Sequence, residues 1–246
     1  TRNVSQIGLS PFSACTQLTE INVDEANPYF SSLDGVLTDK NRTTIVAYPA
    51  GKGKRYIIPD GITKIGTHSF FACYPITYIH IPNSVKTIEL FAFASCTDLD
   101  TIILGNSVDS IEVAAFRIND RLKTIYSMNP IPPAAHTGAF DSFNSFFIQC
   151  TLHVPVGSLQ AYKNAEVWKN FKNIVENDFT GIERPSPNKA KIFGNKNSIA
   201  FRNIEPDTDI SIYDTTGKCI KTFAVDGDCE IPFPSGIYLI KYAGRT

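Results

Sequence analysis

The side chains best suited to nucleophilic, acid–base or metal chemistry in this chain are its histidines and cysteines. They are His68, His80, His136 and His153, with Cys15, Cys73, Cys96, Cys150, Cys219 and Cys229. No two cysteines have C-x-x-C spacing, and no cysteine and histidine share the spacing of a zinc site. The motifs G-x-S-x-G and H-E-x-x-H and the Walker loop are absent from the sequence. We therefore predict no catalytic residue, no metal and no cofactor, and we expect a protein that is not an enzyme.

Two of the cysteines recur at a fixed spacing. Cys73 and Cys96 are 23 residues apart, and Asn119 stands 23 residues further on. If repeats stack roughly 4.7–5 Å apart, as adjacent strands do, the two thiols lie within disulfide range. We favour a column of small buried thiols, with a disulfide as the alternative. A disulfide between Cys219 and Cys229 is left open in the same way. Asn119 is expected to bond the turn backbone.

The same period of 23 residues runs through the apolar positions of the chain. The aligned columns are Ile58, Ile81 and Leu104; Ile65, Ile88 and Ile111; Phe70, Phe93 and Phe116; Ile76, Leu99 and Leu122; and Ile79, Ile102 and Ile125. An earlier partial copy keeps Ile7, Phe12, Cys15, Leu18 and Ile21 in register. A fixed apolar period in the twenties is typical of a solenoid, whose coils bury their faces against their neighbours. The predicted fold is therefore a mostly β solenoid of 23-residue coils.

Each coil is predicted to hold a short strand at the pattern L-x-x-I-x-[IL]. Ile76, Ile79 and Ile81 should face inward, and the residues between such positions outward, because side chains alternate along a strand. The outward column contains Glu20, Asn22, Tyr78, His80, Thr101, Ile103, Thr124 and Tyr126. The candidate ligand-binding residues are the aromatic and apolar ones: Tyr78, His80, Ile103 and Tyr126. Such groups on a rigid sheet suit contact with protein or glycan, and cross-strand packing that merely stabilises the sheet is the alternative.

Two further elements are predicted within residues 1–180. Residues 24–57 interrupt the repeats, and the β-rich runs Val36–Thr38 and Thr43–Tyr48 predict an inserted hairpin. Residues 152–176 should cap the last coil, because a solenoid needs its open end covered. Within this cap, a helix with Ser158 at its N-cap is predicted from the apolar positions Leu159, Tyr162, Ala165, Trp168 and Phe171.

The remainder of the chain changes character. Residues 181–191 are polar, contain two prolines and have no periodicity, so we assign them to a linker. Residues 192–246 contain several short β-rich runs with turn signals between them. The expected structure is a small antiparallel β-sandwich.

The repeat, the hairpin and the cap together resemble the BspA-like leucine-rich-repeat surface proteins of Bacteroides and related organisms. The resemblance rests on the opener Ile58-Pro59 and Ile81-Pro82, on Ala92-Phe93 with Cys96, and on Asp34 to Leu37, and it covers residues 7–176. The third coil departs from the pattern, with Asn119 in place of cysteine and Leu104-Gly105 in place of Ile-Pro. The resemblance implies a leucine-rich-repeat solenoid with varied binding partners, such as host matrix proteins, host cells or other bacteria.

The C-terminal tail resembles the sorting domain of the type IX secretion system in Bacteroidetes. Its motifs are Ile212-Tyr213-Asp214 with Gly217, and Pro234 with Gly236-Ile237-Tyr238. This resemblance implies export across the outer membrane and display on the cell surface, with a sorting or anchoring role for residues 192–246.

Charge and hydropathy restrict the partners. The net charge of −1 argues against nucleic acid, because phosphate binding favours a basic face. The tight basic cluster Lys52, Lys54 and Arg55 is interpreted as a solvated turn. No apolar run approaches the roughly 18–20 residues that span a bilayer, so no membrane span is predicted. We expect a monomer.

The leading hypothesis is a non-enzymatic, secreted or cell-surface binding module that adheres to host or microbial proteins or glycans through the exposed sheet. The alternative is a structural surface-layer or stalk component without a specific ligand. A third possibility, a hydrolase fragment, would require two carboxylates, or a histidine beside a nucleophile, in one concave pocket.

Overall fold

The computed structural model describes residues 2–140, 144–179, 191–195, 198–202, 208–214, 216, 218–225, 229–234 and 239–243. The chain divides into two compact units, Thr1–Glu183 and Arg184–Thr246. Residues 181–190 of the predicted linker lie outside the described residues, and Lys191 already begins a strand.

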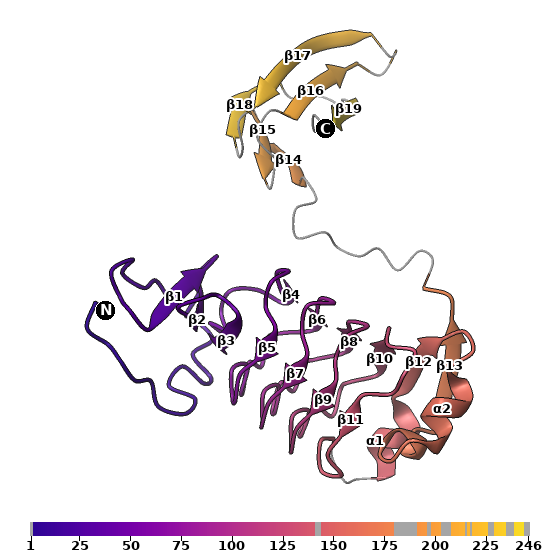
Figure 1. The fold of residues 1–246 in the computed structure, drawn as a ribbon. Coiled ribbons are helices and arrows are strands. Elements are labelled where there is room, and N and C mark those ends of the chain that lie inside the picture. Colours follow the sequence, from indigo (N-terminus) through magenta and orange to yellow (C-terminus); the bar gives the residue numbers. More distant parts are fainter. Residues whose placement is uncertain are drawn as a thin grey trace. The chain divides into compact units, whose positions relative to one another are not determined.

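The first unit is a solenoid with two sheets, and each coil adds one strand to each sheet (Figure 1). The seven-stranded sheet contains, in spatial order, β1 (Phe30–Leu33), β2 (Val36–Asp39), β3 (Thr44–Ala47), β5 (Lys64–Ile65), β7 (Thr87–Ile88), β9 (Ser110–Ile111) and β11 (Ala134–Ala135). The six-stranded sheet contains β13 (Asn173–Asn177), β12 (Thr151–Pro155), β10 (Thr124–Ser127), β8 (Thr101–Leu104), β6 (Tyr78–His80) and β4 (Arg55–Ile57). Apart from β1 to β3, neighbouring strands pair in parallel.

The predicted repeat is confirmed as the core of this solenoid. Ile76, Ile79 and Ile81 are fully buried, and so are the matching residues of the next coil. The strands of successive coils pair in the register that the 23-residue period predicts, because Ile79 pairs with Ile102 and Ile102 pairs with Ile125. The phenylalanine column forms a stack through Phe70, Phe93, Phe116 and Phe140, with ring centroids 4.8, 5.4 and 5.3 Å apart. Each coil therefore packs on its neighbour through the phenylalanine at the equivalent position of the repeat.

The cysteine column lies beside this stack as free thiols rather than as a disulfide. The Cys96 thiol donates to the carbonyl oxygen of Phe70 at 3.1 Å, and the Asn119 amide donates to that of Phe93 at 3.0 Å. The expectation for Asn119 is thus confirmed. Burial raises the pKa of Cys73 to about 12, and burial also raises that of Cys96 well above its usual value. Cys219 and Cys229 are also unbridged.

These environments predict two classes of thiol in the native protein. Cys15 and Cys219 are exposed, whereas Cys73, Cys96 and Cys150 are buried. Since the thiolate is the reactive form, we expect the exposed pair to react with Ellman's reagent at pH 8 and the buried three to react only after unfolding. A C15S/C219S variant should lose the fast phase, and a fast phase that persists at its full amplitude would contradict the assignment.

The predicted hairpin is confirmed and extended by a strand. β2 and β3 pair antiparallel, as expected, but β1 also pairs with β2 through the tight turn Asp34-Gly35. Both turn residues have positive φ, 48° and 69°, which is the conformation favoured by two-residue hairpins. β3 then pairs in parallel with β5, so the insert forms the end of the seven-stranded sheet. Within residues 24–57, Arg55–Ile57 belongs to the solenoid as β4.

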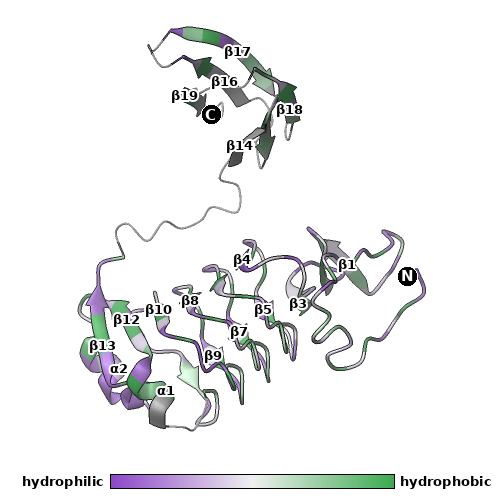
Figure 2. Cartoon of the chain, turned by 180° about the vertical axis from the view of Figure 1, so that it is seen from behind, coloured by the Kyte–Doolittle hydropathy of each residue, from purple (hydrophilic) through white to green (hydrophobic). Residues whose placement is uncertain are grey.

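The cap differs from the single predicted helix. A short helix α1 (Asn144–Gln149) precedes β12, and the cap itself contains α2 (Leu159–Asn164), a 3₁₀ turn (Trp168–Asn170) and β13. The chain leaves the helix at Ala165, which is extended. Tyr162, Trp168 and Phe171 are buried as predicted. The mainly polar strand β13 forms the end of its sheet (Figure 2).

Ser158 occupies the N-cap position of α2 but makes no capping bond with its side chain. The carboxylate of Glu176 in β13 accepts instead from the backbone N–H groups of Gly157 and Leu159, at 2.8 and 3.2 Å. The residue that stabilises the start of α2 is therefore an acidic side chain from the last strand.

The second unit is built from two antiparallel three-stranded sheets. Their strands are β14 (Lys191–Asn195), β15 (Ser198–Arg202) and β18 (Cys229–Pro232), and β17 (Cys219–Val225), β16 (Thr208–Tyr213) and β19 (Leu239–Ala243). A small core joins them through Ile199, Phe201, Ile210, Ile212 and Phe233. In the predicted motif, Ile212 is the last buried residue of β16. The Asp214 carboxylate, which follows the strand, accepts hydrogen bonds from the backbone N–H groups of Thr216 and Lys218.

Candidate functional site

The candidate site is the outer face of the six-stranded sheet. Strand pairing places its outward side chains in two columns across the coils. One column contains Arg55, Tyr78, Thr101, Thr124, Thr151 and Asn173. The other contains Ile57, His80, Ile103, Tyr126, His153 and Val175. All four predicted site residues lie on this face, in adjacent columns.

Two of the four are less exposed than predicted. His80 retains 8% of its accessible surface and Ile103 retains 3%, whereas Tyr78 and Tyr126 are half-buried. The prediction that His80 and Ile103 are exposed is wrong. Ile103 lies between His80 and the ring of Tyr126 in its column, and neighbours in a column stand about 5 Å apart. A large side chain between two rings is covered on both flanks. These two residues form the floor of the face.

The ring of Tyr78 makes a cation–π contact with Arg55. The guanidinium carbon of Arg55, one repeat earlier, lies 3.8 Å from the ring centroid. Burial raises the pKa of Tyr78, and the opposing effect of Arg55 is smaller. The sequence interpretation placed Arg55 in a solvated turn, but this residue lies in β4. Arg55 stands 23 residues before Tyr78, one repeat period, and this spacing could have placed it on the same face from the sequence.

Tyr126 is part of an aromatic cluster. Its ring stacks on His153 with centroids 4.6 Å apart, and Phe179 meets it edge-on at 6.4 Å. Burial lowers the pKa of His153, so the imidazole is the neutral form near pH 7. His153 is not among the candidate site residues predicted from the sequence. The alignment of LHVP at residues 152–155 with the earlier strands would have placed it in this column.

The face offers stacking surfaces and hydrogen-bonding groups and no arrangement for catalysis among the described residues. His68 stacks on Phe91, and His136 accepts a hydrogen bond from the backbone N–H of Gly138. Over the described ranges, no group of three or more His, Cys, Asp or Glu side chains is arranged to hold a metal ion. No helix within those ranges has the length and apolar character to cross a membrane.

Comparison with solved structures finds several proteins that are similar to this chain. Among solved structures, a leucine-rich repeat protein from Eubacterium ventriosum is 25% identical with a TM-score of 0.50, and the alignment covers 63% of this chain and 40% of that one. A leucine rich cell surface protein from Faecalibacterium prausnitzii is 20% identical with a TM-score of 0.40, over 71% and 46% of the two chains. The pneumococcal vaccine antigen PcpA is 18% identical with a TM-score of 0.43, over 65% and 50%.

The chain thus spans 40% to 50% of the length of these three proteins. A search of curated proteins gives no match. The family model that does match is the BspA type leucine rich repeat region, over residues 49–152. This segment contains β4 to β11 and the phenylalanine stack, so the repeats predicted from the sequence are similar to leucine-rich repeats of the BspA type.

Proposed function

We propose that this protein is a non-enzymatic binding module that adheres to host or microbial proteins or glycans through the outer face of its six-stranded sheet. The observation that carries the proposal is the presence of half-buried aromatic rings on this face: Tyr126 stacked on His153, and Tyr78 two strands away in the adjacent column. Rings held by neighbours lose little conformational entropy on binding, and aromatic and arginine side chains dominate binding energy at interfaces.

The geometry supports recognition rather than chemistry. Arg55 keeps its guanidinium over the ring of Tyr78, on an exposed edge of the face, where it can reach an anionic or polar group of a partner. His80 and Ile103 lie too deep to contribute more than a floor. The binding residues that we propose are therefore Tyr78 and Tyr126, together with Arg55 and His153, while His80 and Ile103 support them.

We further propose that the protein is secreted or displayed on the cell surface of a Bacteroides-type organism. The division into a solenoid domain (1–180), a linker (181–191) and a sorting or anchoring domain (192–246) is part of this proposal. It is supported by the compact second unit and by the Asx-type turn that Asp214 forms after β16. Surface display would be tested by protease shaving of cells that express the full chain.

A binding screen with matched tyrosine variants tests the adhesion site. Purified protein is applied to arrays of host matrix proteins and glycans, beside the double variant Tyr78→Ala/Tyr126→Ala. Since interface tyrosines contribute about 2 kcal/mol or more, affinity should fall by more than about tenfold. Tyr74→Ala is the matched control, because Tyr74 is an exposed tyrosine outside this sheet.

Equal loss in the control, or full binding by the double variant, would remove the site from this face. Absence of binding to every target, combined with ordered self-association, would favour the structural surface-layer or stalk alternative.

A further inference from the structure

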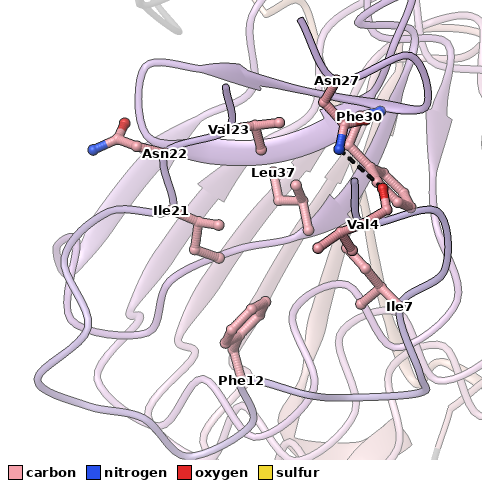
Figure 3. Close-up of a pocket in the computed structure, with 9 residues that line it drawn as sticks. All are labelled: Val4, Ile7, Phe12, Ile21, Asn22, Val23, Asn27, Phe30 and Leu37. Carbon is pink, nitrogen blue, oxygen red and sulfur yellow. Dashed lines mark hydrogen bonds between the residues drawn. The ribbon is translucent and has the colours of Figure 1, made fainter. Parts of the chain in front are cut away.

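The N-terminal end of the solenoid unit contains an apolar cavity that the binding face does not involve. Its volume is about 140 Å³, and it lies between the hairpin β1–β2 and the segments that precede it (Figure 3). The lining side chains include Val4, Ile7, Phe12, Ile21, Phe30 and Leu37. Figure 3 shows them converging from several chain segments on one space.

The cavity exists because the hairpin separates two apolar regions. Val36 packs into the main core, while its neighbour Leu37 faces the cavity, as alternation along a strand requires. The partial repeat copy at residues 7–21 covers this outer side incompletely. Ile7, Phe12 and Ile21 remain half-buried, whereas the equivalent side chains of later coils are fully buried.

The lining determines the chemistry of a ligand. Its two polar side chains are already engaged. The Asn27 amide donates to the carbonyl oxygen of Val4 at 2.9 Å and its oxygen accepts from the N–H groups of Tyr29 and Phe30, and Asn22 donates to Glu20. A sugar would therefore find few free hydrogen-bonding groups among the lining side chains. An enclosed apolar cavity of about 150 Å³ takes benzene. This cavity has a similar volume but opens to solvent, so one phenyl or branched aliphatic group can enter and fill it.

The surroundings of the cavity indicate where such a group comes from. Val4, Leu9 and Tyr29 are exposed to 41%, 75% and 55%, so apolar surface continues outside the cavity. Glu20, Asp24 and Glu25 are exposed in the adjoining segment, and the Lys40 ammonium donates to the backbone carbonyl oxygens of Glu25 and Asn27, so three carboxylates stand against this one lysine. An apolar anchor within a larger acidic-rimmed contact is the usual arrangement for a protein partner.

We propose that this cavity is a second binding site, for a protein partner that presents a phenylalanine or leucine side chain flanked by lysine or arginine. The site does not depend on the adhesion function proposed for the sheet face, because the two share no residue. The aliphatic or phenyl group fills the cavity, and the flanking cations face Glu20, Asp24 and Glu25.

Benzene tests the cavity itself. We expect saturable shifts of the methyl resonances of Ile7, Val23 and Leu37 in the full chain. Val23→Phe fills the cavity and should abolish these shifts. Val113→Phe is the matched control, since Val113 is also half-buried but lies on the repeat turns, and it should bind benzene normally. Absent shifts in the wild-type protein, or unchanged shifts in Val23→Phe, would overturn the proposal.

Three peptides test the partner chemistry, with a central phenylalanine between lysines, the same phenylalanine between glutamates, and a serine between lysines. The lysine–phenylalanine peptide should bind about three- to tenfold more tightly than the glutamate peptide, because surface ion pairs contribute modestly. Salt should reduce this difference. Equal affinity for all three peptides would overturn the partner assignment. It would also be overturned if sedimentation showed that the wild-type protein self-associates and that Val23→Phe does not.

Discussion

Phe93→Ala is expected to lower the free energy of unfolding of the solenoid unit by about 3–5 kcal/mol. Phe93 is fully buried in the middle of the phenylalanine stack, with Phe70 at 4.8 Å on one side and Phe116 at 5.4 Å on the other. Truncation leaves a cavity between two coils that contact only their neighbours, so both interfaces are weakened by one substitution.

Urea unfolding of the full chain measures this effect through the fluorescence of Trp168, the single tryptophan, which lies in the same unit. Phe91→Ala is the matched control, because Phe91 belongs to the same coil but lies half-buried outside the core, beside His68. Its expected cost is about 1 kcal/mol. If both variants lost the same stability, the stack would not be the main support of the coils.

Trp168→Ala is expected to have an effect of similar size, about 3–5 kcal/mol, located at the cap. The indole is fully buried, its Nε1–H donates to the carbonyl oxygen of Pro133 at 2.7 Å, and its ring contacts Tyr162, Phe140 and Phe171. Removal of this side chain leaves a buried carbonyl without its donor and weakens the packing of the cap on the last coil. Amide exchange should then accelerate first in β12 and β13.

Trp168→Phe separates the two contributions. It keeps an aromatic ring in the cap but leaves the carbonyl of Pro133 unpaired, which costs about 1–3 kcal/mol. Circular dichroism during urea unfolding compares the variants without a tryptophan signal. A loss in Trp168→Phe as large as in Trp168→Ala would assign the whole effect to the hydrogen bond. Unchanged exchange in β13 would contradict the capping role.

Much of the fold could be predicted from the sequence because a 23-residue period repeats every structural requirement several times. Ile79, Ile102 and Ile125 occupy one column in the sequence and one ladder in the sheet, so each copy corroborates the others. The same alignment predicted that Asn119 bonds the turn backbone, and the structure identifies its partner as the carbonyl oxygen of Phe93. Agreement among several independent columns is stronger evidence for a fold than the secondary-structure propensity of any single segment.

The cap shows where local pattern is insufficient. Leu159, Tyr162, Ala165, Trp168 and Phe171 are spaced by three residues, which drifts from the helical period of about 3.6. The chain instead breaks at Ala165, so that Trp168 reaches Pro133 and β13 pairs with β12. That pairing gives backbone partners to a sheet edge that a longer helix would leave open. A non-local hydrogen-bonding requirement thus outweighed the apolar spacing.

The sequence by itself determined the coil length, the inward side chains, and the strands on which Tyr78, His80, Ile103 and Tyr126 lie, because strand alternation and repeat register are local properties. Only the tertiary structure decided how much of each side chain reaches solvent. Stacking brought His153 onto Tyr126 and Arg55 over Tyr78, and it enclosed Ile103 between two rings. It also decided that the hairpin presents Leu37 to an unfilled apolar cavity. Exposure and cavity volume depend on what packs from distant segments, and no periodicity within one segment contains that information.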